Sequence, residues 1–434
     1  MCTSFRQARG PRAGGHCAAA SRSVAFAVSV ALAVAQGTSS HSNAEHGAKP
    51  ISSPGNQEKD LARAVKSSVG YLSKACSPRG RFAYSIDAGN GGVSRSYNIV
   101  RHAGGIYALA MYNQFHPDAR ALDTMTRAAD FMRTVYISRD TRSNELVVWS
   151  KATGFTTDAE LGGAALGLVA LAEVAKAQPA SVPLEDLQSL ARFVISMQKP
   201  DGSFFSKYRA EVGPVSGGES LYYPGEAALG LIDLYEVDHT RQWLAAAAKG
   251  LSCLAKSRQG TQKLPDDHWA LIATAKLLPH YDRAASPGSR EELIQHARDI
   301  CNVMLAEQIT VSGDPRLVGG FTPIGLTTPT ATRLEGLLAA LEFLPREDVE
   351  LRKRIEAAAK LGVDFLLRAQ IKSGPFAGGM PGIMPRASLV MKAAARESEV
   401  RIDYVQHALC AWLRYENMFL RGGAKHAERP TTRP

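Results

Sequence analysis

The sequence has few of the patterns that mark metal-binding or redox proteins. It contains six cysteines in 434 residues, and none of them has CxxC spacing. No HxH or HxxxH spacing occurs, and His102, His268 and His407 lie far apart along the chain. These absences exclude the usual zinc-knuckle and dithiol motifs. We therefore expect no metal site and no cofactor.

Dense basic runs and long apolar runs are also missing. No basic run with interleaved aromatic residues occurs, so nucleic acid is not expected as a partner. The apolar stretch Val24–Val34 is shorter than the roughly 20 residues that a transmembrane helix needs. It follows a basic segment without acidic residues and leads into Ala33-Val34-Ala35, a small-x-small cleavage site. This arrangement is typical of a secretory signal.

We therefore predict a signal peptide over residues 1–35 and an exported protein, periplasmic or secreted, without stable membrane insertion after cleavage. An uncleaved membrane anchor is the alternative. Residues 36–57 are rich in Ser, Gly, Asn and Pro and are predicted to form a flexible leader. Cleavage removes four arginines and no acid, so the formal charge falls from +10 to +6. The resulting mildly basic surface is compatible with attraction to an acidic polymer.

The mature chain shows an alternation of two kinds of helical segment, each with apolar residues at the helical period of about 3.6. One kind is amphipathic with a charged face and is predicted over residues 59–76, 118–138, 183–198, 240–256, 289–308 and 346–370. The other kind is rich in Ala, Gly and Leu and is predicted over residues 98–114, 157–177, 223–238, 266–282, 328–345 and 402–420. A helix that is apolar nearly all round is buried. The alternation therefore predicts two concentric rings of six helices, with the Ala/Gly-rich set inside.

Several of the amphipathic segments end in a comparable way. Residues 70–82 (GYLSKACSPRGRF), 191–205 (ARFVISMQKPDGSFF) and 363–376 (VDFLLRAQIKSGPF) each contain a helix end, a turn with glycine and then an aromatic residue. Glycine and proline end a helix at such positions. We interpret the three segments as a degenerate repeat, followed by short strands or loops on one rim.

With its helix count and its Q-x-x-DGSF-type repeat, the chain resembles the α/α-toroid proteins. That group includes six-hairpin glycosidases, the C-terminal domain of glucuronyl C5-epimerases and terpenoid cyclases. Residues 222–238 (YYPGEAALGLIDLYEVD) and 401–413 (RIDYVQHALCAWL) are similar to toroids that act on sugars. The resemblance covers about residues 59–420 and implies an all-α (α/α)6 toroid of twelve helices over residues 58–420, with a disordered tail over 421–434. It specifies the fold better than the reaction, because one fold carries many functions.

All six predicted inner helices carry polar residues at or near their starts, which would face the mouth of a funnel. Acids, imidazoles and aromatic rings at a concave site are the materials of sugar chemistry, in which one carboxyl group protonates the leaving oxygen and another activates water or attacks. Arginines bind a uronate carboxylate bidentately. We predict acid–base roles for Glu226, Asp267 and Asp403, then His268 and His407, and substrate contacts from Arg101, His102, Glu160, Tyr223, Trp269, Arg333, Glu335 and Tyr404.

The same residues also have structural interpretations. Acids and threonines at helix starts are ordinary caps, and acid–arginine pairs can simply hold a ring together. Against this, three of the glutamates precede Gly- or Ala-rich runs, where a buried charge is costly unless it is paired or used. The structural alternatives are caps at Asp158, Asp266 and Thr328, ion pairs Arg101–Glu160 and Arg333–Glu226, and core histidines at His102 and His407.

The predicted function is a carbohydrate-active enzyme that acts outside the cytoplasm on an oligo- or polysaccharide, uronate-containing ones included, with glycoside hydrolysis as the favoured reaction. A uronate C5-epimerase or polysaccharide lyase, with Tyr or His as base and acid, is one alternative. A non-catalytic toroid that binds a glycan or a protein is another. A terpenoid cyclase-like enzyme is a further alternative, but Pro265-Asp266-Asp267-His268 lacks the extra acid of a DxDD cluster and aromatics are only 7% of the chain.

The signal peptide gives the first testable prediction. N-terminal sequencing of protein recovered outside the cytoplasm is expected to start near Gln36, because the small-x-small site lies just before it. Exported material that still contains Val24–Val34 would contradict cleavage.

Overall fold

The computed structural model describes residues 54–284, 288–385 and 396–421, all of which belong to the compact unit Ala48–Pro434. The predicted signal peptide, the leader up to residue 53 and the tail from residue 422 lie outside the described residues. None of the described helices combines the length and the apolar character needed to cross a membrane.

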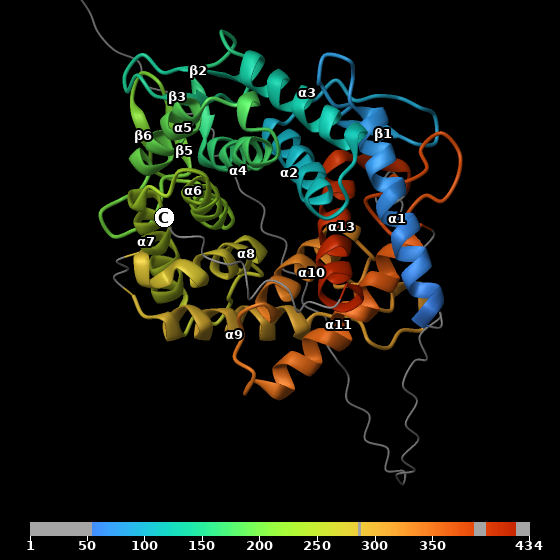
Figure 1. The fold of residues 1–434 in the computed structure, drawn as a ribbon. Helices are drawn as coiled ribbons and strands as arrows, with labels where there is room; N and C mark the ends of the chain where they lie inside the picture. The colour runs from blue at the N-terminus through green and yellow to red at the C-terminus, as the bar shows by residue number, and fades with distance from the viewer. Residues whose placement is uncertain (1–53, 285–287, 386–395, 422–434) are drawn as a thin grey trace, which may run out of the picture. The chain divides into compact units, whose positions relative to one another are not determined.

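Within the described residues, twelve longer helices alternate between two layers (Figure 1), as the sequence predicted. The outer helices are α1 (Pro54–Ala75), α3 (Ala119–Tyr136), α5 (Leu184–Ser196), α7 (Arg241–Arg258), α9 (Arg290–Ala306) and α11 (Val349–Ala369). The inner helices are α2 (Ile99–Phe115), α4 (Leu161–Ala177), α6 (Tyr223–Asp238), α8 (His268–Leu277), α10 (Thr327–Leu341) and α13 (Ile402–Tyr415). Short helical turns are η1 (Pro179–Ser181), η2 (Leu278–Arg283), η3 (Pro315–Leu317) and the π-turn η4 (Glu416–Leu420).

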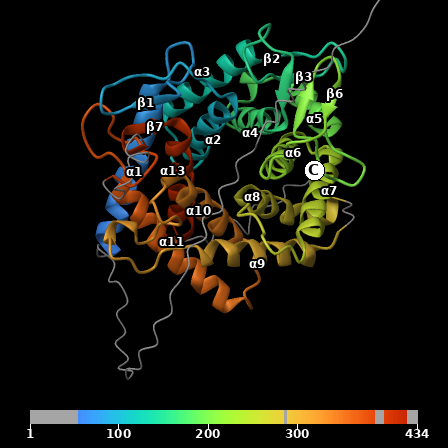
Figure 2. The same ribbon diagram turned by 180° about the vertical axis from the view of Figure 1, so that it is seen from behind.

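The inner helices form a closed ring. Each packs against the next in the order α2, α4, α6, α8, α10 and α13, and α13 packs back against α2. The views from the two sides show the same arrangement, with the outer helices covering the inner ones (Figures 1 and 2). This is the (α/α)6 toroid that the sequence predicted.

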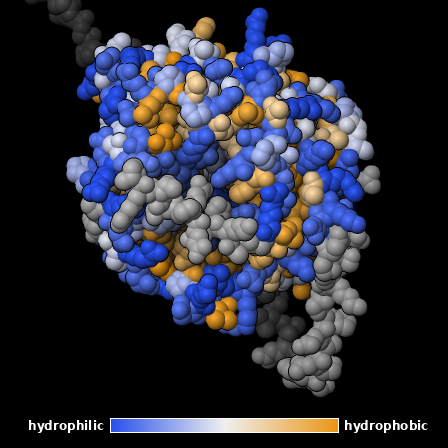
Figure 3. Space-filling model, in the orientation of Figure 1, coloured by the Kyte–Doolittle hydropathy of each residue, from blue (hydrophilic) through white to orange (hydrophobic). Residues whose placement is uncertain are grey.

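The residue composition of each layer explains its place. Every residue of α4 from Leu161 to Ala172 is buried, because an Ala-, Gly- and Leu-rich helix has no polar face to turn toward water. Outer helix α3 buries only one stripe, in which Ala121, Met125, Ala128 and Met132 recur at helical spacing. The face in Figure 3 is correspondingly mostly hydrophilic, with scattered apolar patches.

Short strands lie in the connections that lead from an outer helix to the following inner helix. The strands are β1 (Ser85–Asp87), β2 (Ile137–Arg139), β3 (Leu146–Val148), β4 (Asp158–Glu160), β5 (Lys207–Arg209), β6 (Gly213–Val215) and β7 (Glu399–Arg401). β4 runs directly into α4, and β7 runs directly into α13. β1 and β7 pair antiparallel, with Ile86 opposite Val400, so the first and last hairpins of the ring are joined at this rim.

The sequence repeat corresponds to a joint between neighbouring outer helices. After four outer helices, a glycine in the left-handed region meets a backbone carbonyl of the next outer helix. A Cβ atom would lie 2.7 Å from that oxygen at Gly202 and about 2 Å from it at the other three. Only glycine can adopt this conformation at such a short approach without a clash. The pairs are Gly80 with Arg127, Gly202 with Lys249, Gly319 with Leu361 and Gly378 with Ser67.

A glutamine reinforces three of these joints. The side-chain amides of Gln198, Gln308 and Gln370 each donate a 2.9 Å hydrogen bond to a carbonyl of the next outer helix. In the first repeat, Cys76 stands at the glutamine position, and its bridge to Phe82 matches the bridge of Gln198 to Phe204. Three copies of the repeat were predicted from the sequence. The fourth copy, which contains Gln308 and Gly319 after α9, was not.

The predicted leader ends earlier than expected. Helix α1 begins at Pro54, so residues 54–57 are helical rather than part of a flexible segment. Gln57 is buried, and its side-chain amide donates a 2.7 Å hydrogen bond to Asp364 of α11. The reason is that closing the ring brings α11 against α1, which gives this turn a partner that the linear sequence does not reveal.

The contact between outer helices predicts that substitutions at two glycines of one loop differ in their effect on stability. Gly378 and Gly374 both have positive φ, but a Cβ at Gly378 would meet the Ser67 carbonyl at 2.0 Å, whereas nothing lies within 4 Å of a Cβ at Gly374. We expect Gly374→Ala to cost about 1–2 kcal/mol from backbone strain alone and Gly378→Ala to cost clearly more. Urea unfolding of both variants measures this. Equal losses would show that the carbonyl contact does not limit the turn.

Candidate functional site

Residues from four inner helices meet beside the start of α8. Asp267 is the N-cap of α8, and its side chain accepts a hydrogen bond from the Ala270 amide at 3.1 Å. His268 and Trp269 form the first turn and are both buried. Their rings contact each other and His407 of α13, and Trp269 also contacts Tyr107 of α2. The first turn of α8 therefore faces the inside of the ring.

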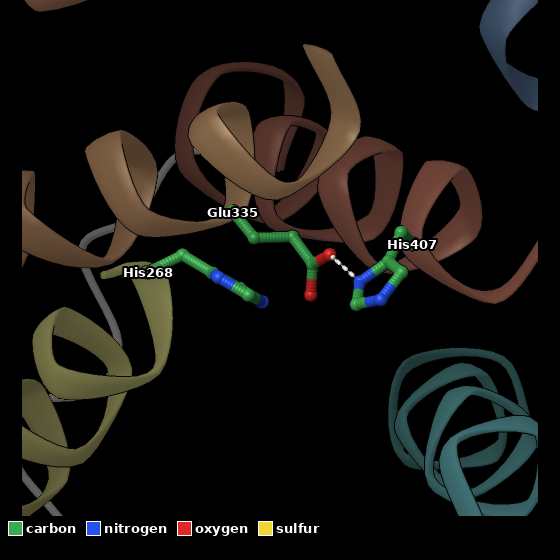
Figure 4. A group of neighbouring side chains, drawn as sticks. All are labelled: His268, Glu335 and His407. Atoms are coloured by element: carbon green, nitrogen blue, oxygen red, sulfur yellow. Dashed lines mark hydrogen bonds and ion pairs between the residues drawn. The ribbon is translucent and has the colours of Figure 1, made fainter. Parts of the chain in front are cut away.

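A carboxylate and two imidazoles converge at this place (Figure 4). The ring centroids of His268 and His407 are 5.5 Å apart. Nδ1 of His407 shares a 2.6 Å hydrogen bond with Oε1 of Glu335 on α10. We call His268, Glu335 and His407 the histidine centre. Three separate helices supply it, and 139 positions separate its first and last members in the sequence.

The histidine centre contains polar atoms that have no partner. Neither ring nitrogen of His268 has a hydrogen-bond partner among the described residues, and neither does Oε2 of Glu335. Both side chains are at least 95% buried. Leaving a buried polar group unsatisfied costs about 1–3 kcal/mol. Burial also lowers the pKa of His268 well below 6.5, so its imidazole is neutral and carries a free lone pair. These atoms are therefore available to a bound molecule.

Glycines allow the inner helices to come close enough for this contact. A Cβ at Gly336, next to Glu335, would lie 3.0 Å from Cα and Cβ of His268. A Cβ at Gly225, next to Glu226, would lie 2.7 Å from the Ala270 amide. The Gly- and Ala-rich runs behind the acids, noted in the sequence, thus set the distances between neighbouring inner helices.

A second group surrounds Glu226 of α6. Burial raises the pKa of Glu226 well above its usual value, and the nearby carboxylates of Asp267 and Glu160 raise it further. Oε2 of Glu226 has no partner among the described residues. The Tyr223 hydroxyl donates a 2.8 Å hydrogen bond to Glu160. Burial therefore favours the neutral form of Glu226, next to a Glu160 that is already hydrogen-bonded.

The other two leading acids are held by arginines. Asp403 accepts two hydrogen bonds from Arg401, at 2.9 and 2.6 Å, and lies 3.2 Å from Nε of Arg101. Asp267 pairs with Arg258 at 2.8 Å. Both carboxylates are therefore held in place by ion pairs, although burial raises the pKa of Asp267. The geometry therefore favours a positioning role for Asp403 and Asp267 over the acid–base roles that the sequence suggested.

The structure also corrects the predicted substrate contacts. His102 is fully buried, bonded to the Ala128 carbonyl and the Tyr97 hydroxyl, and burial lowers its pKa to about 4. It faces α3 rather than the funnel, because the first turn of α2 also packs outward. Arg333 pairs with Asp266 at 2.9 Å and with Glu307 at 2.5 Å. Two further substrate-binding candidates form hydrogen bonds at the same rim. The Tyr404 hydroxyl donates to Glu399, and Glu160 accepts from the Tyr223 hydroxyl.

The predicted caps and pairs differ as well. Asp158 lies in β4 and pairs with Arg209, and Asp267 rather than Asp266 caps α8. Helix α10 begins one residue before Thr328, with no side-chain cap. The expected pairs Arg101–Glu160 and Arg333–Glu226 are replaced by pairs with Asp403, Asp266 and Glu307. Asp158 is not a cap because strand β4 runs directly into α4, whereas α8 and α10 begin within two residues of the predicted positions.

Sequence reasoning missed several residues of the site. Tyr84 accepts a hydrogen bond from Arg101, and its ring lies under Arg401, with the guanidinium carbon 6.0 Å from the ring centroid. Arg258 comes from an outer helix, and Arg414 lies beyond the first turn of α13. The aromatic position of the repeat, Phe82, lies two residues before Tyr84 and is the only sequence signal that pointed toward it.

Among the residues that the structure describes, two groups of side chains have donor atoms close enough for a metal ion. The ligand atoms of the histidine centre lie within 4.8 Å of one another, and so do those of Glu173, Asp233 and Glu236. The expectation of no metal site rested on the distance between the histidines in the sequence. The ring brings two of them together.

A cavity of about 210 Å³ lies on the same rim, between the starts of α2 and α4. Asn98, Ser150 and Glu160 contribute polar groups to its wall. Because Glu160 also bonds to Tyr223, the cavity is connected to the group around Glu226.

No family model matches the chain, and no curated protein matches it in sequence. Solved structures do match. A D-mannose isomerase is 11% identical, with 83% of this chain and 99% of that chain covered and a TM-score of 0.62. The cellobiose 2-epimerase of Bacillus thermoamylovorans B4167 is 12% identical, with 83% and 99% covered and a TM-score of 0.61. A GH76 α-mannanase of Bacteroides thetaiotaomicron is 13% identical, with 84% and 98% covered and a TM-score of 0.54. At these identities the likeness shows the fold, and it confirms the resemblance to the α/α toroids.

The buried acid gives a pH prediction. Because the pKa of Glu226 is raised in the folded chain, its neutral form stabilises the fold at low pH, and this contribution is lost as the pH rises through the native pKa. Gln cannot ionise. We therefore expect the melting temperature of Glu226→Gln, relative to wild type, to increase as the pH rises above 4.5, the ordinary pKa of a glutamate. Exposed Glu356 of α11 supplies the control, Glu356→Gln. A pH-independent difference for Glu226→Gln would refute the assignment of a neutral acid.

Proposed function

We propose that this protein is a carbohydrate-active enzyme that moves a proton at the carbon next to a sugar carbonyl, which is the chemistry of an aldose epimerase or isomerase. One observation carries the proposal. Two imidazoles reach one space inside the ring, one bonded to a buried carboxylate and the other without any partner among the described residues.

The arrangement fits proton transfer step by step. With the sugar in its open-chain form, one neutral imidazole removes the proton from the carbon beside the carbonyl, and the electron pair moves to the carbonyl oxygen to give an enediolate. The other imidazole, in its protonated form, returns a proton to the same carbon from the other side, or to the former carbonyl carbon while the hydroxyl hydrogen of the neighbouring carbon moves to the former carbonyl oxygen. The first outcome is an epimer and the second an isomer. Such general acid–base catalysis contributes typically 10²–10⁴-fold.

Glu335 sets the role of His407. Its carboxyl group bonds to Nδ1, so the ring is fixed and Nε2 is the nitrogen left for the substrate. His268 is held by ring contact with Trp269 at 4.8 Å and by the approach of Gly336. Both imidazoles are thus oriented by other residues, which is a requirement for a defined reaction geometry.

The similar structures support a sugar substrate, since their names are those of a mannose isomerase, a cellobiose epimerase and a mannanase. An uncharged sugar fits better than a uronate. Arg101 and Arg333, which the sequence analysis assigned to an acidic substrate group, already have carboxylate partners within the chain. The 210 Å³ cavity beside Glu160 offers room for a further sugar unit, so an oligosaccharide is included among the proposed substrates.

Glycoside hydrolysis is the second candidate, and Glu226 favours it. A buried carboxyl group with a raised pKa is the usual general acid of such enzymes. Hydrolysis also needs an ionised carboxylate on the opposite side of the glycosidic bond that is cleaved. Asp267 and Asp403 are held by arginines, which leaves Glu160 for that role. Action outside the cytoplasm is also proposed, on the predicted signal peptide alone.

The proposal predicts exchange of a substrate proton with solvent. In D2O, D-mannose and cellobiose should each be converted with deuterium appearing at the carbon beside the carbonyl, as followed by proton NMR. His268→Asn and His407→Asn should each lower this rate roughly 100-fold or more. His116→Gln serves as control, because His116 bonds to Glu416 at the far ends of α2 and α13.

The outcomes separate the two candidates. Release of reducing ends from an α-mannan would indicate hydrolysis. If this activity is lost in Glu226→Gln and kept in His407→Asn, hydrolysis replaces isomerisation as the proposed function. Folding of each variant is checked by circular dichroism. Full exchange activity in folded His407→Asn would remove the histidine centre from the mechanism.

A further inference from the structure

The histidine centre has a second chemical property. Three side chains, His268, Glu335 and His407, place one donor atom each within 4.8 Å of the others. Two imidazoles and a carboxylate form a donor set that suits zinc and the neighbouring first-row metals. The spacing is slightly wider than that of donors around one ion, and small side-chain rotations close such a gap.

Two of the three side chains also have metal-donor atoms without a hydrogen-bond partner. Both nitrogens of His268 and Oε2 of Glu335 are buried without a hydrogen-bond partner among the described residues. His268 is 4% exposed and Glu335 is fully buried. Figure 4 shows the two side chains and His407 pointing toward one space. A buried polar side chain without a partner, aimed into a group of metal-binding donors, points to a ligand that completes the group.

We propose that His268, Glu335 and His407 bind one divalent transition-metal ion of the zinc type, with a fourth position open to water. The ion accepts the lone pairs that the protein leaves unused. It is held by three helices, and the contact of Gly336 with His268 sets the distance between α10 and α8. Trp269 and Tyr107 cover the site with apolar surface, which restricts solvent access.

The other candidate group supports this choice by contrast. Glu173, Asp233 and Glu236 also approach within 4.8 Å, but Lys176 and Lys276 lie among them. Nζ of Lys176 is 2.6 Å from Glu236 and 2.8 Å from Glu173, and Lys276 bonds to Asp233. Two ammonium groups already occupy the place of a cation there. No such group lies among the donors of the histidine centre in the described part of the chain.

Neighbouring positive charges do not prevent binding. Arg333 and Arg414 lie close enough to His268 to act on it electrostatically. Each is matched by acids, Arg333 by Asp266 and Glu307, and Arg414 by Glu342 at 3.0 Å. The charge facing the ion is therefore that of Glu335.

Metal binding and proton transfer use the same lone pairs and exclude each other. If the proposed function holds, Zn²⁺ inhibits the sugar reaction and a chelator restores it. This consequence rests on the proposed function. Binding itself does not, so it is measured without any sugar.

The test uses the mature protein after dialysis against a chelator. Isothermal titration with Zn²⁺ is expected to show one site per chain, and Co²⁺ is expected to give visible absorption bands of a low-coordinate site. His268→Ala, His407→Gln and Glu335→Gln should each weaken Zn²⁺ binding roughly 100-fold or more. His116→Gln and Glu173→Gln are matched controls that should bind as wild type does.

The results decide the proposal independently of enzyme activity. Zn²⁺ should raise the melting temperature of wild type but not of His407→Gln. No stoichiometric binding to wild type, or equal binding to folded His407→Gln, would overturn the metal site. If His268→Ala does not fold, the half-buried His407 and the conservative Glu335→Gln still decide the question. Sugar exchange without metal binding would leave only the proposed function standing.

Discussion

The close approach of neighbouring inner helices is the constraint on which the site depends. Gly162, Gly225 and Gly336 lie where a Cβ atom would meet a neighbouring inner helix at 3.0 Å or less. A larger residue at any of them would push two helices apart and widen the ring. The distances between Tyr223 and Glu160, and between His268 and Glu335, follow from that packing. The helix backbone, more than any local loop, therefore places the polar groups.

The two ends of the inner ring treat buried charge in opposite ways. At the C-terminal ends of α4, α6 and α8, two lysines pair with three acids, and each of these groups takes part in at least one ion pair, although Oδ2 of Asp233 has no hydrogen-bond partner among the described residues. At the N-terminal ends, His268 and Glu226 remain with unsatisfied atoms. Natural proteins rarely leave buried polar atoms unpaired. One end of the ring is thus built for cohesion, and the other retains unsatisfied groups that a ligand can use.

The sequence predicted the fold well because the signal is repeated. Six alternations of amphipathic and apolar helices and several copies of one turn all indicate the same architecture. The partners of individual polar residues were not predictable. Asp403 meets Arg101 across some 300 positions, and the pairing depends on how far each helix is rotated about its axis. Gly378, rather than Gly374, meets the next helix for the same reason. His102 and Arg101 are neighbours in sequence, yet they point to different layers.

The closure of the ring has a consequence for the order of assembly. Gln370 of α11 bonds to Ala64 of α1 over a separation of 306 residues, and β7 pairs with β1 just before α13 begins. Contacts of this range form late, since the chain between them must be arranged first. On the ribosome, the apolar sides of α1 and α2 therefore stay uncovered until almost the whole chain has emerged. Helix α13 is the last inner helix of the ring, and it also carries His407. Nascent chains shorter than this have an open edge and no complete histidine centre, so completion of the fold and completion of the site are the same event.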